Sequence, residues 1–244
     1  MSQHWTDVLH TIGMLVPATN TAAEVEVNRI LPEQFYVHIG RLQVSSVDAK
    51  GWAEQDADID YQAKILGTIN PAVIILLQTS ASFFSDGYDD EVCARIRTAS
   101  GANAITTAQA LVQALHALDA RRVAFVSPYS PAVSARARDY LQAENGFDVV
   151  AVEGLNITDP STITGLQSGP ITSALERAAK ANPDVFVVAG GAFHGVRFIA
   201  EWEQHLRRPV VTTNQLAVWA ALRAVSASGP IAGYGRLLEI DRDS

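Results

Sequence analysis

Two groups of small and polar residues stand where buried strands are predicted to end. The run Gln78–Ser80 follows the apolar stretch Val73–Leu77, and the run Gly190–Ala192 follows Asp184–Val188. Their hydroxyl and backbone N–H groups are donors that could bind a carboxylate or polarise a carbonyl. Ligands of open α/β sheets bind at the carboxyl ends of the strands. The pairing predicts one site built from two halves, although each run alone could be an ordinary strand ending in a turn.

The elements that position these runs occur twice in the chain. Five consecutive aliphatic residues, as in Val73–Leu77, predict a strand buried on both faces of a parallel sheet. Pro17 and Pro128 end corresponding strands, and Asn70–Pro71 and Asn182–Pro183 precede the two strands that lead to the polar runs. The offset of about 111 residues between these pairs indicates a duplication rather than a solenoid.

Strands alternate with helices in both halves, which is typical of βαβ units and parallel sheets. The sequence therefore predicts an α/β fold with two pseudo-symmetric lobes, each a roughly four-stranded parallel sheet flanked by helices, with the site in the cleft between them. We expect the first lobe to comprise residues 1–106 with the C-terminal helix and tail, 214–244, and the second to comprise residues 107–213.

Three local expectations accompany this fold. Thr21 and Glu24 have the spacing of a capping box at the start of the first helix. The polar stretch Val47–Asp60 is expected to be a loop or a lid. Trp202 and Trp219 could form the interface of a homo-oligomer or lie in the core, and the core is the preferred interpretation.

Composition excludes several classes of partner. Of the 244 residues 48% are hydrophobic, and the net charge of −8 comes with no basic stripe, so we expect no nucleic acid. The single cysteine excludes an internal disulfide and a multi-cysteine zinc site. No metal-ligand or phosphate-loop motif occurs, so no metal or cofactor is expected. Residues 1–10 lack a signal pattern and no apolar run approaches the roughly 20 residues that span a bilayer, so we expect no membrane contact and a cytoplasmic location.

Several motifs together resemble the Asp/Glu racemase superfamily, in the branch of the arylmalonate decarboxylases and maleate cis-trans isomerases. The resemblance covers most of the chain, and the Thr-Ser-x-Ser-Phe run and the terminal Gly-Tyr-Gly-Arg-Leu run are its more specific parts. The motifs are Pro17–Thr21, Gln78–Phe84, Tyr129, Gly191 and Gly233–Leu237.

This resemblance implies a small carboxylate substrate bound between the lobes. It implies that the hydroxyls of Thr79, Ser80 and Tyr129 bind a carboxylate and its developing enediolate, and that Asn20 contacts the substrate. Fixed donors aimed at oxygens that gain negative charge lower a reaction barrier. The residues expected to bind substrate are Asn20, Gln78, Thr79, Ser80, Gly190 and Gly191.

The chain departs from the family where proton transfer takes place. We call Gln78–Ser80 the first mouth of the site and Gly190–Ala192 the second mouth. The racemases and isomerases of the family use one cysteine at each mouth, and the decarboxylases keep only the second of these cysteines. Gln78 and Gly190 stand at these positions, and Cys93 lies on the following helix, where a buried structural thiol is expected. The resemblance thus implies that carboxylate binding is retained and that the thiols are missing or replaced.

Three residues are candidates for the catalytic groups. His194 lies four residues after Gly190 and could exchange protons near neutral pH, or could simply pack on the next helix. Asp86 could reach over the cleft, or could form a turn with Gly87. Tyr129 could donate a hydrogen bond to a carboxylate.

These expectations favour a cofactor-independent hydrolase or a decarboxylase-like lyase acting on a small carboxylate, carbonyl or imide compound without a cysteine. One alternative is an isomerase resembling maleate isomerase or a racemase, with other acid–base groups. A second alternative is a non-catalytic protein that binds small acids.

Overall fold

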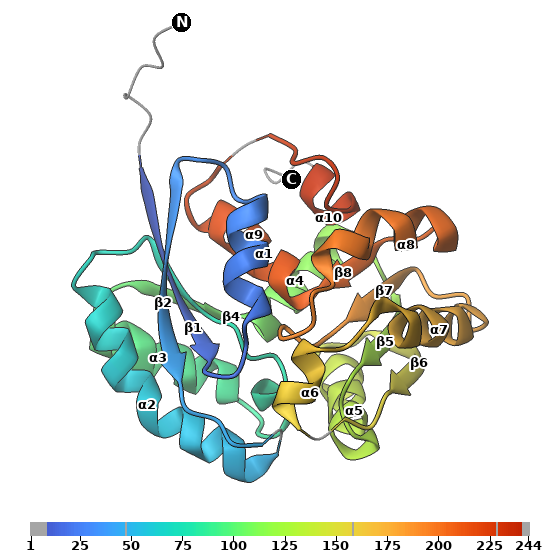
Figure 1. Ribbon diagram of the computed structural model, residues 1–244, viewed down its shortest axis with the longest axis horizontal. Helices are drawn as coiled ribbons and strands as arrows, with labels where there is room; N and C mark the ends of the chain where they lie inside the picture. Colours follow the sequence, from blue (N-terminus) through green and yellow to red (C-terminus); the bar gives the residue numbers. More distant parts are fainter. Residues whose placement is uncertain (1–8, 47, 158, 228, 241–244) are drawn as a thin grey trace, which may run out of the picture.

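A computed structural model describes residues 9–46, 48–157, 159–227 and 229–240 of the chain. Two four-stranded parallel sheets lie side by side, with the first on the left in Figure 1. The first has the order β2-β1-β3-β4 and the second the order β6-β5-β7-β8. The strands are β1 (His10–Pro17), β2 (Phe35–Leu42), β3 (Val73–Leu76), β4 (Asn103–Thr106), β5 (Arg122–Ser127), β6 (Asp148–Gly154), β7 (Val185–Val188) and β8 (Val210–Thr212).

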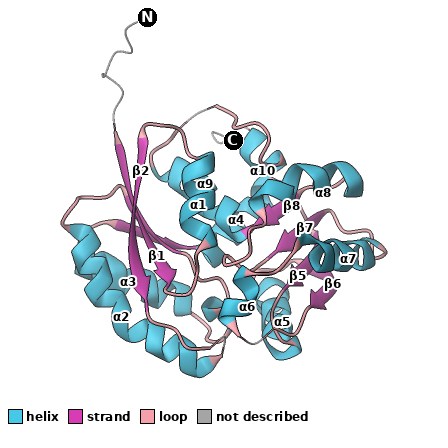
Figure 2. Ribbon diagram, in the orientation of Figure 1, coloured by secondary structure: helices cyan, strands magenta, loops and turns pink. Residues whose placement is uncertain are grey.

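Helices follow nearly every strand, as Figure 2 shows by colour, and the α/β prediction is confirmed. The longer helices are α1 (Ala22–Ile30), α2 (Ala49–Gly67), α3 (Tyr88–Ser100), α4 (Thr107–Ala117), α5 (Pro131–Asp139), α7 (Ser168–Ala179), α8 (Ile199–Leu206) and α9 (Thr213–Ala224). The short ones are α6 (Pro160–Thr164), α10 (Arg236–Glu239), the 3-10 turns η1 (Ala81–Phe83) and η3 (Val196–Phe198), and the π-helical turn η2 (Tyr140–Glu144).

The internal repeat is visible in local geometry. Asn70 and Asn182, which precede prolines at corresponding positions, both adopt left-handed backbone conformations, with φ values of 49° and 48°. Helices α4 and α9 both begin with a complete capping box, in which a threonine bonds the backbone of a glutamine and the glutamine bonds back. The same sequence signals therefore produce the same turns in both halves.

The two lobes meet through helices rather than through a shared sheet. Helix α9 packs against α4 and α1, and these three lie between the sheets in Figure 1. Trp219 of α9 is 1% exposed and Trp202 of α8 is 2% exposed, so both belong to the core of this chain and are not available for an interface. The proposed division of the chain into lobes at residues 106 and 213 stays a prediction.

The predicted loop or lid at 47–60 is wrong for residues 49–60, which form the first three turns of α2, and Val47 lies outside the described residues. Asp48 caps the helix by accepting bonds from the N–H groups of Lys50 and Gly51. Trp52, Gln55 and Ile59 are buried at helical spacing. The buried face of this helix includes a glutamine, Gln55. Its apolar periodicity is therefore too weak in the sequence to indicate a helix.

Among the described residues, no helix is both long enough and apolar enough to cross a membrane. Residues 1–8, on which the expectation of no signal segment mainly rests, lie outside the described part of the chain.

Candidate active site

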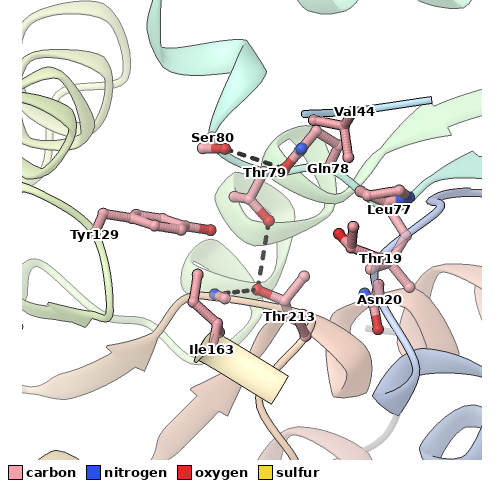
Figure 3. Close-up of a pocket in the computed structure, with 14 residues that line it drawn as sticks. Thr19, Asn20, Val44, Leu77, Gln78, Thr79, Ser80, Tyr129, Ile163 and Thr213 are labelled. Atoms are coloured by element: carbon pink, nitrogen blue, oxygen red, sulfur yellow. Dashed lines mark hydrogen bonds between the residues drawn. The ribbon is translucent and has the colours of Figure 1, made fainter. Parts of the chain in front are cut away.

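A cavity of about 40 Å³ lies between the lobes, at the carboxyl ends of strands β1, β3, β5 and β7. Figure 3 shows side chains from both lobes pointing into it. All six residues expected to bind substrate line it, and so does Tyr129. Its lining residues are Pro17, Thr19, Asn20, Val44, Leu77, Gln78, Thr79, Ser80, Tyr129, Ile163, Gly190, Gly191, Ala192 and Thr213.

Asn20 enters the cavity because it caps helix α1. Its Oδ1 accepts hydrogen bonds from the N–H groups of Ala22 and Ala23, both at 3.0 Å. The predicted capping box of Thr21 and Glu24 is therefore wrong: Thr21 has a helical conformation and makes no side-chain capping bond. Since the helix occupies Oδ1, the Nδ2 group of Asn20 is the part left to donate to a ligand.

Thr79 lies in a chain of buried hydroxyls that joins the two halves. Its Oγ1 is 3.0 Å from Oγ1 of Thr107. It is also 3.4 Å from Oγ1 of Thr213, which in turn accepts a bond from Gly190 N at 3.2 Å (Figure 3). Thr107 and Thr213 are the first residues of α4 and α9. The positive ends of two helices therefore converge on the wall of the cavity, which favours an anionic ligand.

Gln78 and Ser80 are held by hydrogen bonds to protein groups. Nε2 of Gln78 donates to Oε1 of Gln55 at 3.2 Å, and Oγ of Ser80 donates to Oε1 of Gln78 at 3.0 Å. The amide of Gln78 is thereby fixed at the first mouth. An amide forms hydrogen bonds but does not exchange protons at neutral pH.

Tyr129 comes from the loop after β5 and points its hydroxyl toward Thr79 and Thr213 in Figure 3. Its side chain is 5% exposed. Burial raises the pKa of its phenol well above the ordinary value, and a hydrogen bond with Ser80 offsets only part of this. The hydroxyl therefore stays protonated and serves as a donor rather than as a base.

The second mouth requires glycine at two positions. Gly190 has a φ of 109°, and a Cβ there would lie 2.9 Å from the ring of Pro128. A Cβ on Gly191 would lie 2.7 Å from Leu77 Cδ2 and 3.0 Å from Asn214 Oδ1. Gly190 can therefore pack against Pro128 of its own lobe, and Gly191 can approach Leu77 of the first lobe, only without side chains.

No charged side chain occurs among the described residues that line the cavity. A carboxylate there would be held by neutral donors: the amide of Asn20, the phenol of Tyr129, hydroxyls and the backbone of the two mouths. Hydrogen bonds to an ionised oxygen are stronger than those between neutral groups. In a site closed to water, such a set can stabilise an enediolate or a similar oxyanion.

The structure does not bring His194 or Asp86 to the cavity. Asp86 lies in an exposed turn with Gly87, which is the alternative that its sequence allowed. His194 is half-buried beside Arg197 and Arg29, and burial and these two positive charges lower the pKa of its imidazole. No contact supports the expected role of either residue as the acid or base.

Cys93 lies on α3, away from the cavity, and its side chain is 1% exposed. Burial, and next the negative charge of Asp89, raise the pKa of its thiol to about 12. Its Sγ is 3.4 Å from Oε1 of Gln109. A thiol in this state is a poor nucleophile, as expected for a structural cysteine.

Glu26 is a residue near the site that sequence reasoning missed. It is 3% exposed and lies on the buried face of α1 with Val27 and Ile30. A glutamate at an apolar position of an amphipathic helix is the signal that could have revealed it. Burial raises the pKa of its carboxyl to about 7, although hydrogen bonds from Asn214 and Val196 and the charges of Arg29 and Arg197 lower it in part.

This pKa predicts a pH dependence of stability. Between the ordinary value of 4.5 and about 7, the folded state binds more protons at Glu26 than the unfolded state does. The free energy of unfolding therefore falls as pH rises through this window, by up to about 3 kcal/mol, and the fall ends above it. Urea unfolding at several pH values should show this fall in the wild type, and Glu26→Gln should remove that part of it. Parallel pH curves for the two proteins would contradict the prediction.

Comparison with known proteins identifies relatives that match most of the chain. The family model described as arylmalonate decarboxylase matches residues 12–238. A maleate isomerase of Pseudomonas putida is 28% identical over 94% of this chain and 97% of its own. An arylmalonate decarboxylase of Bordetella bronchiseptica is 28% identical over 94% of this chain and 96% of its own. A crystal structure of the maleate isomerase of P. putida S16 with maleate superposes with a TM-score of 0.89, at 25% identity, over 94% of this chain and 97% of that one.

Proposed function

Because the chain belongs to the arylmalonate decarboxylase family, we propose that it is an enzyme that acts on a small carboxylic acid by stabilising an enediolate, without using a thiol. The observation that carries this proposal is the cavity itself. Neutral donors surround it, from Tyr129, Asn20 and the two mouths. Its described lining residues include no cysteine.

The relatives name two reactions that share this intermediate. The maleate isomerase of P. putida and the arylmalonate decarboxylase of B. bronchiseptica both match at 28% identity, so similarity favours neither reaction. Addition of a nucleophile to one carbon of the double bond of a cis-enedioate leaves the electron pair of that bond on the other carbon, next to a carboxylate, as an enediolate. Loss of CO₂ from a malonate leaves the electron pair of the broken C–C bond on the remaining carboxylate as an enediolate. Isomerisation of maleate and decarboxylation of a malonate are therefore the two reactions to test.

One observation favours decarboxylation. Breaking the C–C bond of a malonate needs no base, only stabilisation of the ion formed and a proton for its carbon, which water can supply. The described lining residues include no histidine, lysine or carboxylate. Hydrolysis, the other reaction expected from the sequence, has less support because no lining residue is suited to activate water.

The test is an assay of the purified protein with maleate, followed as fumarate formation, and with phenylmalonate, followed as CO₂ release. We expect turnover of one of the two. Saturable binding of a dicarboxylate without turnover of either would instead favour the non-catalytic binding protein. Absence of both binding and turnover would refute the proposal.

Independence from thiols gives a separate prediction. Cys93→Ala should leave kcat and KM unchanged, because this side chain is buried outside the cavity and its thiol has a raised pKa. It should lower the free energy of unfolding by about 1 kcal/mol, because a small cavity remains. Thiol reagents should likewise leave the native enzyme active. Loss of turnover in Cys93→Ala with an intact fold would show that the thiol takes part after all.

A further inference from the structure

Glu26 joins the first lobe to the loop that forms the second mouth. Its Oε1 accepts a hydrogen bond from Val196 N at 3.0 Å, and its Oε2 accepts one from Nδ2 of Asn214 at 2.7 Å. Val196 lies 170 residues away in sequence and Asn214 lies 188 residues away. Glu26 is on the same helix, α1, whose first turn holds Asn20 at the cavity.

Asn214 continues this contact to the cavity wall. Its Nδ2 also donates to the carbonyl of Gly191 at 2.9 Å. Both hydrogens of the amide are therefore used, and its Oδ1 must face the α-carbon of Gly191, where a Cβ would lie 3.0 Å from it. The same point is 3.3 Å from Nδ2 of Asn20. The carboxylate of Glu26 thus holds both ends of the segment 191–196, directly at Val196 and through Asn214 at Gly191. The Gly191 end lies beside Nδ2 of Asn20.

Stability does not explain a carboxylate at this place. The pKa of about 7 shows that burial makes the ionised form costly. Buried ionic groups are commonly no more stabilising than apolar residues of similar volume. Costly buried titratable groups gather at functional sites. What the ionised form offers is two acceptors for two donors, which neither glutamine nor leucine can provide.

We infer that Glu26 is a positioning residue of the active site, whose carboxylate orients Asn214 and thereby fixes the Gly190–Ala192 backbone against Asn20. It acts through Asn214 and Gly191, because it does not itself line the cavity. The expected effect of Glu26 on substrate binding and turnover rests on the proposed function. Its expected effect on the conformation of the second mouth does not depend on any reaction.

Glu26→Gln is the direct test. A glutamine has one acceptor oxygen, so its NH₂ group must face either Val196 N–H or Nδ2 of Asn214, and one contact is lost. We expect the amides of Gly190 and Phe193, which bond Thr213 Oγ1 and Gly190 O, to exchange with solvent roughly tenfold faster or more in the free protein. Affinity for maleate, measured by calorimetry, should fall by a similar factor.

Glu203→Gln is the matched control. Glu203 is a half-buried glutamate with a raised pKa, and it accepts bonds from the backbone N–H groups of Val210 and Arg236, away from the cavity. This variant should lose stability, while exchange at Gly190 and Phe193 and the affinity for maleate keep their wild-type values. The comparison separates positioning of the mouth from a general loss of stability.

Should Glu26→Gln fail to fold, Asn214→Ala removes the bond to Gly191 and leaves Val196 on Glu26, and it should produce the same faster exchange. Wild-type exchange at Gly190 and Phe193 in the folded variant, or equal effects of the Glu26 and Glu203 variants, would overturn the inference. A protein that neither binds nor converts dicarboxylates would refute the proposed function, and the exchange measurement would still decide the role of Glu26.

Discussion

Replacing Tyr129 by phenylalanine is expected to lower kcat roughly a hundredfold or more while the protein keeps its fold. Removal of one donor from a site that stabilises an oxyanion typically costs a factor of about 10² to 10³ in kcat. The ring of Tyr129 is buried and would remain in place, so only the hydroxyl is lost. In the proposed reaction the hydroxyl would donate to an oxygen whose negative charge grows, so kcat should fall more than KM rises.

Tyr140→Phe provides the comparison for this result. Tyr140 is also a buried tyrosine, and its hydroxyl donates to Oδ2 of Asp89 at 2.7 Å, outside the cavity. This variant should lower the free energy of unfolding by about 2 kcal/mol, because a bond to a charged group is lost. It should leave kcat unchanged. If Tyr129→Phe keeps the wild-type kcat, the phenol is not a donor to the reacting oxygens, and the assignment of Tyr129 to the active site is wrong.

The fold and most of the cavity wall could be predicted from the sequence because they depend on local patterns. Buried parallel strands are continuous apolar runs, and ligands of such sheets bind at the carboxyl ends of the strands. The residues that follow β3 in the first sheet and β7 in the second therefore face the same cleft. Thr79, Ser80, Gly190 and Gly191 lie at the cavity for this reason. The repeated Asn-Pro pair showed where each of these strands begins, and both asparagines adopt the same turn.

His194 shows where reasoning from chain distance fails. It is only four residues from Gly190, but the chain turns in between: Phe193 N donates to Gly190 O, and Gly195 N donates to Phe193 O. The ring of Phe193 is buried against Trp202, with ring centroids 6.3 Å apart. His194 itself does not line the cavity, and its spacing from Gly190 does not reveal the turn between them.

Glu26 and Asn214 show a different limit. The apolar position of Glu26 on its helix indicates that its side chain is buried, but not what it contacts, and its bond with Asn214 joins positions 188 residues apart. A pair of this kind becomes visible only when α1 and α9 are packed together between the sheets. The sequence could therefore place the donors that line the cavity, but not the buried groups behind them.

Gly191→Ala is expected to have the other large effect, a fall in kcat/KM of about a hundredfold or more. The new methyl group would lie 2.7 Å from Leu77 Cδ2, 3.0 Å from Asn214 Oδ1 and 3.3 Å from Asn20 Nδ2. The leucine tip can move, but the two amides are each held by hydrogen bonds, so the lobes must separate or Asn20 must shift. A displacement of about 1 Å in a positioned group can cost a factor of about 10² in rate.

The same methyl group should lower the free energy of unfolding by about 1 to 3 kcal/mol, as expected for overpacking. Gly169→Ala is the matched substitution, because a Cβ at Gly169 in the first turn of α7 meets no atom within 4 Å. It should leave kcat/KM unchanged and raise stability by up to about 1 kcal/mol, since alanine restricts the unfolded chain. Steady-state kinetics and urea unfolding of both variants measure these effects. Full activity of Gly191→Ala would mean that the second mouth tolerates a side chain against Asn20, and that the close approach of the lobes at this glycine does not set the position of the donors.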